Sequence, residues 1–270
     1  MFTVGIDIGS TTCKSVIIND GSIIVGRAIV PFGTGTIGPK RVYQSVLDSC
    51  GLSRDDIERT LVTGYGRFTF DDADNQKSEM SCHAKGVNFI IPSARTIIDI
   101  GGQDAKALRI NPNGMLEDFV MNDKCAAGTG KFLDVMAGIL NVKVADLGII
   151  SEHSQVEVSI SNTCTVFAES EVISKLSMNV AIEDIIAGIH RSVAKKVAAL
   201  VYRNGIVKDV AMSGGVALNK GVVGAMRKEL KTDILVHEDC QLAGALGAAL
   251  FAWEEAVKAN RCSQTQKNNE

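Results

Sequence analysis

One pattern occurs twice in the chain and limits the possible folds more than any other feature. It is a short apolar strand that ends in an aspartate, followed by glycine and small polar residues: TVGIDIGSTT at residues 3–12 and TIIDIGGQDA at residues 96–105. A third glycine-rich turn, within DVAMSGGVALNKGV at residues 209–222, also follows a short apolar strand and leads into a helix. The sequence separation of Asp7 and Asp99 suits one α/β lobe, so the repeat predicts two lobes that arose by duplication.

The segments between these turns predict an α/β fold. Apolar residues at three- and four-residue spacing indicate helices from Gly38, Gly130, Val166, Asp184 and Gly244. The segments TLVTGYG, TIIDIG, VEVSIS and KDVAMSGG have the character of strands and alternate with these helices.

The length of 270 residues is sufficient for two modest lobes around separate cores. We assign residues 1–94 with 245–262 to lobe I, residues 95–244 to lobe II, and residues 263–270 to a frayed polar tail.

Composition excludes several classes of protein. The net charge is −3 and the Lys and Arg residues are scattered, which argues against nucleic acid as a partner. No window of ~18 uncharged apolar residues occurs, so we expect no membrane span. The amino terminus lacks the pattern of a secretory signal, so we expect a cytoplasmic protein. Its seven cysteines, an odd number, do not indicate a disulfide framework in a reducing compartment.

The first two turns have the chemistry of a nucleotide site. Glycine lets backbone N–H groups approach phosphate oxygens, and hydroxyls and a lysine add further donors. The carboxylates of Asp7 and Asp99 could hold Mg²⁺ through water, and Gln103 and Asp104 could orient the attacking water, with Asp7, Gln103 and Asp104 as catalytic residues. The residues expected to contact the phosphates are Gly9, Ser10, Thr11, Thr12, Cys13, Lys14, Gly101, Gly102 and Gln103.

Other phosphate-binding motifs are absent. The chain has no G-x-x-x-x-G-K-[ST] segment, and no G-x-G-x-x-G follows the first strand. The segment AAGTGKF at residues 126–132 lacks the full Walker spacing and, by our interpretation, follows no strand.

Two cysteines have a setting that suits metal ligands. Cys125 in NDKCAAGTGKF and Cys164 in SNTCTVFAESEV each precede a predicted helix, whose amino end favours an anionic group. A [4Fe-4S] cluster takes four cysteines, so two per chain predict a homodimer with the cluster on its two-fold axis. Glu169 and Glu171 would oppose such a cluster if they pointed toward it. The alternative is that Cys125 and Cys164 are buried packing residues, as cysteines often are. We interpret the other five cysteines in this way: Cys13, Cys50, Cys82, Cys240 and Cys262.

The order of the three turns resembles the superfamily of acetate and sugar kinases, Hsp70 and actin (ASKHA), in which two RNase H-like lobes surround a nucleotide cleft. By that resemblance Gly214, Gly215 and Asn219 would contact the adenosine of ATP or ADP, and Gln241 would lie beside the nucleotide.

Four further segments, NDKCAAGTGKFLDVMA, SNTCTVFAESEVISKL, IIAGIHRSVA and GTGTIGP, resemble the activator component of 2-hydroxyacyl-CoA dehydratases, a family similar to the ATPase subunits of benzoyl-CoA reductases. The resemblance runs from end to end. It implies that Cys125 and Cys164 bind a [4Fe-4S] cluster shared by two subunits. It also implies that ferredoxin or flavodoxin donates an electron, and that ATP hydrolysis drives this electron to a heterodimeric dehydratase to start its radical cycle.

Two other functions remain open at this point. A small-molecule kinase of the same superfamily, acting on a sugar such as N-acetylglucosamine, would need a carboxylate base beside a sugar pocket. A nucleotide-dependent assembly protein of the actin kind would need no cluster. The sequence does not identify the hydroxyacyl-CoA, because an activator need never touch that substrate.

Overall fold

The computed structural model describes residues 1–122 and 124–267. Their contacts divide the chain into two units: unit 1 comprises Met1–Ile90 with the carboxyl-terminal segment from Leu242, and unit 2 comprises Ile91–Gln241. These limits lie a few residues from the lobe boundaries expected from the sequence. Among the described residues, no helix is both long and apolar enough to cross a membrane.

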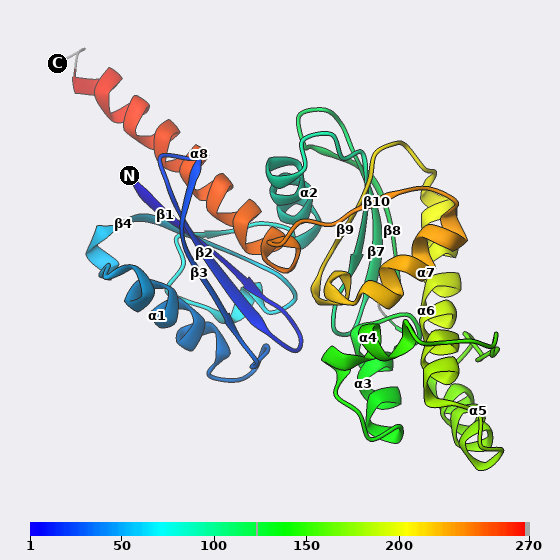
Figure 1. The fold of residues 1–270 in the computed structure, drawn as a ribbon. Helices are drawn as coiled ribbons and strands as arrows, with labels where there is room; N and C mark the ends of the chain where they lie inside the picture. The colour runs from blue at the N-terminus through cyan, green and yellow to red at the C-terminus, as the bar shows by residue number, and fades with distance from the viewer. Residues whose placement is uncertain (123, 268–270) are drawn as a thin grey trace. The chain divides into compact units, whose positions relative to one another are not determined.

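Unit 1 is a five-stranded sheet in the order β3-β2-β1-β4-β5. Helix α1 packs against β3, whereas α2 and α8 pack together, and α8 lies along β1 and β4 (Figure 1). Because helices cover the sheet, β1 is buried along nearly all of its length and has an almost continuous apolar sequence. The elements are β1 Phe2–Ile8, β2 Cys13–Asn19, β3 Ile23–Val30, α1 Gly38–Cys50, β4 Ile57–Thr63, β5 Asn75–Gln76, α2 Glu79–Ile90 and α8 Ala243–Lys267, with short 3-10 turns at Arg54–Asp56 and Arg67–Thr69.

Unit 2 contains a second five-stranded sheet, in the order β10-β9-β6-β7-β8. Its core is formed largely by α6 and α7 with β6, β7 and β9, and α5 extends from this core (Figure 1). The elements are β6 Thr96–Ile100, β7 Ala105–Ile110, β8 Leu116–Asn122, α3 Gly130–Ile139, α4 Leu147–Ser151, α5 Thr165–Ser177, α6 Ile182–Asn204, β9 Val210–Ser213, α7 Lys220–Leu230 and β10 Ile234–Leu235, with 3-10 turns at Val144–Asp146, Gly215–Leu218 and Cys240–Leu242.

The two sheets have the same topology. In each, a first strand pairs antiparallel with the second, which pairs antiparallel with the third, and the first also pairs parallel with the fourth. The fourth pairs parallel with the fifth. Two copies of one topology, each beginning with an aspartate-ending strand, agree with the duplication predicted from the repeated turns.

The predicted helices are confirmed, but two other local predictions are wrong. The segment VEVSIS at residues 156–161 is not a strand, although Val158 and Ile160 are buried in alternation with exposed neighbours. Its alternation arises because one side packs against α6. Residues 263–267, assigned to a frayed tail, continue α8, while residues 268–270 lie outside the described residues.

Candidate functional site

The first of the two turns that are predicted to bind phosphate, here called the phosphate turns, joins β1 to β2 in unit 1. Gly9 N–H donates to Thr12 O at 3.1 Å, and a Cβ on Gly9 would lie only 2.8 Å from that oxygen, so the tight turn requires glycine. Beside the turn, Lys14 Nζ lies 3.2 Å from Asp7 Oδ2, and the Asp7 side chain is 5% exposed. The turn therefore has polar backbone groups at its tip and a buried carboxylate at its base.

The second phosphate turn joins β6 to β7 in unit 2 with the same hydrogen bond, from Gly101 N–H to Asp104 O at 2.9 Å. Lys106 Nζ lies 3.5 Å from Asp99 Oδ2 and 2.7 Å from Asp104 Oδ2. The Lys106 and Asp99 side chains are each 2% exposed. Asp104, predicted to orient water, is thus held in an ion pair with Lys106.

Lys106 adjoins this turn and was not singled out from the sequence. In both turns the aspartate lies directly opposite a lysine in the antiparallel pairing, Asp7 opposite Lys14 and Asp99 opposite Lys106. The signal was present in the sequence, because each lysine follows its aspartate at the same interval. A buried lysine held by two carboxylates fixes the geometry of the turn more strongly than a single pair does.

In each sheet, the aspartate lies beside a hydroxyl-bearing residue on the fourth strand, and a glycine follows that residue. Thr63 lies opposite Asp7, and Ser213 lies opposite Asp99 and donates to its Oδ1 at 2.8 Å. The following glycines, Gly64 and Gly214, have φ of +89° and +83°, and a Cβ on either would lie within 3 Å of the aspartate Oδ1. The sequence analysis singled out the serine-glycine turn but treated Thr63-Gly64 only as part of a strand.

His83 is a second residue near the first phosphate turn to which no role was assigned from the sequence. It lies on α2 and is buried. A Cβ on Gly244, in the first turn of α8, would meet His83 Nε2 at 2.8 Å and Asp7 Oδ2 at 3.2 Å. The imidazole and the Asp7 carboxylate therefore both face the start of α8, where glycine leaves room for them.

The predicted adenosine residues lie together in unit 2. Gly214 and Gly215 lead from β9 into a 3-10 turn, Gly214 N–H donates to Cys240 O at 3.1 Å, and Gln241 Nε2 would be 3.3 Å from a Cβ on Gly215. Gln241 thus borders the same turn.

Asn219 has its side chain engaged within the protein. Its Oδ1 accepts from Gly221 N–H and Val222 N–H, capping α7, and its Nδ2 lies 3.2 Å from His190 Nε2. An adenosine contact from Asn219 would therefore come through its backbone, or through the second N–H of Nδ2. Burial, with a smaller effect of Arg191, lowers the pKa of His190 to about 4, so the ring is neutral and Nε2 accepts from Asn219.

The remaining predicted phosphate residues differ in exposure. Ser10, Thr12 and Gly102 are half-buried, whereas Thr11 and Gln103 are exposed at the tips of their turns. The Cys13 side chain lies in the unit 1 core, where burial raises its pKa to about 12. Only the backbone of Cys13 can serve a phosphate group.

The segments that carry Cys125 and Cys164 meet although they are distant in sequence: Cys125 Sγ lies 4.0 Å from the carbonyl oxygen of Thr163, the residue before Cys164. Cys164 is the N-cap of α5, as predicted. Cys125 is not at a helix end, because the N-cap of α3 is Thr129 and a turn intervenes. The segment AAGTGKF also follows a strand, β8, contrary to our interpretation of the sequence.

The environment of these two thiols suits ligands better than that of the other cysteines. Both are half-buried, and Glu171 accepts a hydrogen bond from Ser161 N–H at 2.7 Å, so its carboxylate is engaged with the preceding segment. Burial raises the pKa of Cys82 to about 12 and of Cys240 to about 11. Cys50 Sγ donates to Val25 O on β3 at 3.4 Å, and Cys262 is exposed on α8.

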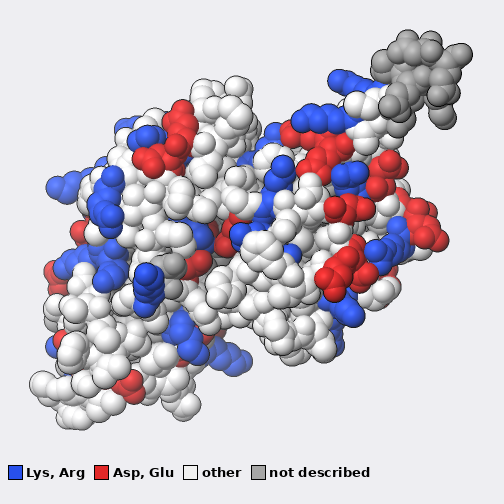
Figure 2. Space-filling model, turned by 180° about the vertical axis from the view of Figure 1, so that it is seen from behind, with Lys and Arg blue, Asp and Glu red and all other residues white. Residues whose placement is uncertain are grey.

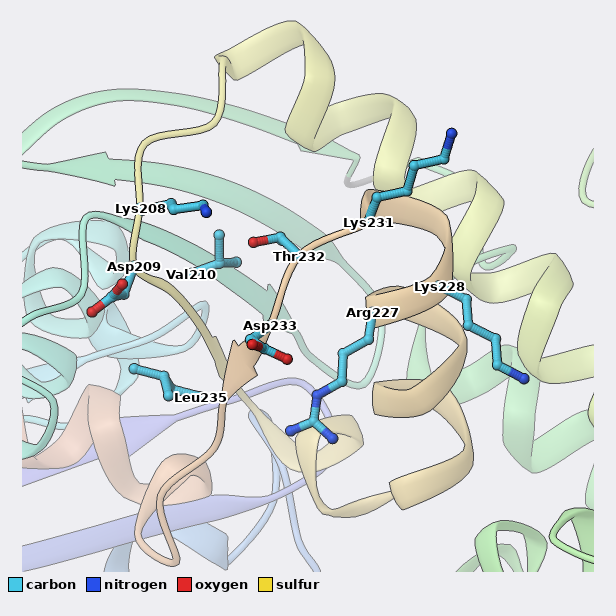
Figure 3. A pocket seen from close by; sticks show the side chains of 9 residues that line it. All are labelled: Lys208, Asp209, Val210, Arg227, Lys228, Lys231, Thr232, Asp233 and Leu235. Atoms are coloured by element: carbon cyan, nitrogen blue, oxygen red, sulfur yellow. The ribbon is translucent and has the colours of Figure 1, made fainter.

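A hollow of about 610 Å³ lies in unit 2, lined by four basic and two acidic residues among others (Figure 3). It adjoins Lys208 and Val210, at the opposite end of β9 from Ser213. Figure 3 shows Lys228 and Lys231 pointing away from it. At ~3.3 Å per residue, the length of β9 separates this hollow from the phosphate turn by roughly 10 Å, too far for an acceptor of a phosphoryl group.

A family model described as "BadF/BadG/BcrA/BcrD ATPase family" matches residues 4–252. The chain belongs to this family. It is therefore an ATPase, with the fold of actin, Hsp70 and the acetate and sugar kinases.

Individual members of this family are similar to the chain over almost its whole length. The chain is 60% identical to the 2-hydroxyisocaproyl-CoA dehydratase activator of Clostridioides difficile over 97% of this chain and 98% of the relative. It is 54% identical to the (R)-2-hydroxyglutaryl-CoA dehydratase activating ATPase of Acidaminococcus fermentans over 96% and 99%. The solved structure of the activator from Clostridium difficile, with bound ADPNP, superposes with a TM-score of 0.94 at 60% identity, covering 97% of each chain.

Proposed function

We propose that this ATPase activates a 2-hydroxyacyl-CoA dehydratase by ATP-driven transfer of one electron. The observation that supports the proposal is the approach of Cys125 Sγ to Thr163 O, because Thr163 directly precedes Cys164 and both cysteines are half-buried. Relatives named as activators of two such dehydratases support the choice of partner.

The donor set fits a [4Fe-4S] cluster shared between two subunits. Such a cluster takes four thiolates, and Cys125 and Cys164 of each chain would supply two. The surface next to Cys164 is apolar: Val166 and Phe167, in the first turn of α5, are 65% and 62% exposed. The end of unit 2 that carries α5 is mostly free of charged side chains in Figure 2. Exposed apolar side chains of this kind are typical of a protein contact, and a second copy of the chain would cover them. Their exposure therefore supports a homodimer.

The phosphate turns supply the ATPase part of the proposal. Asp7 and Asp99 would hold Mg²⁺ through water, and Lys14 and Lys106 keep these carboxylates in place. The N–H groups at Gly9–Thr12 and Gly101–Gln103 would bind phosphate oxygens. Gln103, exposed at the tip of its turn, would orient the water that attacks the γ-phosphorus, helped by Asp104 through its ion pair with Lys106.

Unit 2 links this ATPase turn to the first cysteine. Gly130 N–H donates to Gly101 O at 2.9 Å and Lys131 N–H donates to Gly102 O at 2.8 Å, so the amino end of α3 binds the phosphate turn. The loop that leads into this helix contains Cys125. A movement of the turn on hydrolysis would therefore be transmitted to Cys125 over a few residues.

The overall reaction balances without a net redox change in this protein. ATP and water give ADP and phosphate, while reduced ferredoxin or flavodoxin loses one electron and the dehydratase gains it. The cluster would supply the one-electron carrier between them. We place the protein in the cytoplasm, where such donors and free thiols are found.

Iron and acid-labile sulfide analysis of the protein purified without oxygen tests the proposal. We expect about four of each per dimer. Single Cys125→Ser and Cys164→Ser variants should both lose them, whereas Cys50→Ser, which changes an equally half-buried cysteine in unit 1, should keep them. The wild-type protein could instead hydrolyse ATP but contain no iron even after reconstitution with iron and sulfide. That result would exclude a role as electron carrier and favour a small-molecule kinase of the same superfamily.

A further inference from the structure

The segment from residue 154 to residue 163, here called the strap, leads from the region after α4 to Cys164. Its backbone has no strand partner and bonds to side chains instead. Asp184, near the start of α6, accepts hydrogen bonds from Ser154 Oγ, Gln155 N–H and Val156 N–H at 2.7–2.9 Å. These bonds, that from Val156 N–H most of all, lower the pKa of Asp184. The strap is thus anchored at its beginning to α6.

Two adjacent residues of α6 hold the rest of the strap. Arg191 Nη2 donates to Val158 O at 2.9 Å, and Ser192 Oγ donates to Ser161 O at 2.8 Å. A Cβ on Gly188 would lie 2.5 Å from Val158 O, so the helix and the strap are in close backbone contact. Ser161 precedes Cys164 by three residues, so Ser192 sets the backbone position just ahead of this thiol.

The residue before this pair, His190, contacts the nucleotide motif. Its Nε2 accepts from Asn219 Nδ2 at 3.2 Å, and a Cβ on Gly221 would lie 2.3 Å from the ring. The orientation of Asn219 is fixed, because its Oδ1 accepts two backbone N–H groups at the start of α7. Three consecutive residues of one helix therefore contact the Gly214–Asn219 motif and the strap.

We propose that His190, Arg191 and Ser192 are positioning residues that couple the nucleotide bound at Gly214–Asn219 to the position of Cys164. The inference deepens the proposed function and rests on it for the role of Cys164 as a ligand. Ser192 and His190 are almost fully buried in a close-packed core, so α6 moves as a body and transmits a displacement from one side to the other. The connection is separate from that of α3, which runs to Cys125.

A purely structural role for these bonds makes a different prediction. Buried backbone groups of an irregular segment need partners, and Arg191 and Ser192 supply them. In that case the removal of these bonds would change the reactivity of Cys164 by the same factor in every nucleotide state. Coupling requires instead that the difference between nucleotide states disappears.

The test is the alkylation rate of Cys164 by iodoacetamide, followed by mass spectrometry of its peptide, in full-length protein freed of metal. The rate is measured with ADP and with a non-hydrolysable ATP analogue. We expect the two rates to differ by at least about fivefold in the wild type, the lower end of usual allosteric coupling. Ser192→Ala and Arg191→Gln should bring the ratio close to one, with nucleotide affinity changed by less than about twofold. Arg191 is 30% exposed, so Arg191→Gln should leave the fold intact.

Ser177→Ala is the matched control, because Ser177 Oγ also donates to a backbone carbonyl, that of Ile173, but within α5. It should keep the wild-type ratio. A wild-type ratio of one, or a full ratio in both Ser192→Ala and Arg191→Gln, would overturn the inference. Iron analysis separates this result from failure of the proposed function, since Cys164 reactivity is measured without a cluster.

Discussion

The two phosphate turns share one backbone design but have different neighbours. In unit 1 the turn is held by glycine-containing loops: Thr34 N–H donates to Gly9 O at 2.9 Å, and Gly66 N–H donates to Ile8 O at 2.9 Å. In unit 2 the corresponding position, Gly101 O, accepts from the first residue of α3, whose preceding loop carries Cys125. Both copies of the topology thus keep the same turn, and the turn of unit 2 is bonded to the helix that follows the Cys125 loop.

The ion pairs give the largest expected difference between the turns. Lys106→Met would leave the buried Asp99 and the Asp104 carboxylate without their lysine, and loss of one partner of a buried ion pair costs about 3–5 kcal/mol. Lys14→Met removes a cation that is 14% exposed, so water can replace part of its interaction with Asp7. Urea unfolding and ATPase rates should both show the greater loss in Lys106→Met. A greater loss of stability in Lys14→Met would contradict the comparison.

Glycine substitutions sharpen the comparison by separating nucleotide binding from the cysteines. A Cβ on Gly33 would lie 2.1 Å from Ser10 O, and one on Gly130 would lie 3.1 Å from Gly101 O. Overpacking of this kind costs ~1–3 kcal/mol, so Gly33→Ala should weaken ATP binding roughly tenfold or more and Gly130→Ala less.

Calorimetric titration with a non-hydrolysable ATP analogue measures these affinities, and iron content serves as the second reading. Gly33→Ala should keep its iron, whereas Gly130→Ala should bind iron less tightly because the Cys125 loop ends there. Equal iron binding by both variants would remove the link through α3.

Because His190 is buried in unit 2, we predict that the stability of the folded protein depends on pH. The pKa of His190 falls from 6.5 to about 4 on folding, so the unfolded chain binds more protons between these values and stability decreases as pH falls from about 6.5 toward 4. The full effect is on the order of 3 kcal/mol. Melting temperatures of the wild type and His190→Gln, measured from pH 7.5 to 5, should converge as the pH falls. A constant difference across this range would show that the ring does not stay neutral.

Asp184 gives the smallest expected effect, with the same direction but at lower pH. Its folded pKa lies below the ordinary value of 3.8, so the hydrogen bonds to the strap stabilise the protein above that pH and are lost as the pH falls through the folded value. Asp184→Asn should lower the melting temperature modestly at pH 7. The difference from the wild type should shrink on acidification below about pH 4, and hydrogen exchange at Gln155 and Val156 should be faster in the variant.

The parts of the fold set by local sequence were predicted well. Gly9 and Gly101 lie in tight turns whose geometry depends on glycine, and Asp7 and Asp99 lie near the ends of the strands that precede these turns. The helices followed from apolar periodicity for the same reason. Lys106 was missed because no strand was predicted over residues 105–110, and only the pairing of β6 with β7 shows the lysine to be buried beside Asp99.

The errors occurred where a distant element decides the local structure. The strap has the alternation of a strand because α6 covers one side of it, but its backbone bonds to Asp184, Arg191 and Ser192 rather than to another strand. Cys125 was placed at a helix end because glycine follows it closely, whereas the chain first makes a turn and caps α3 at Thr129.

The central claim is that ATP hydrolysis in the duplicated turns drives electron transfer from this protein to a dehydratase. Stopped-flow spectroscopy tests it directly: the anaerobically reduced protein is mixed with an oxidised 2-hydroxyacyl-CoA dehydratase, and the visible iron-sulfur absorbance is followed. We predict rapid oxidation with MgATP, and rates at least about 100-fold lower without nucleotide or with Lys106→Met, corresponding to about 2.7 kcal/mol of activation free energy. Oxidation at the same rate with and without MgATP would contradict it.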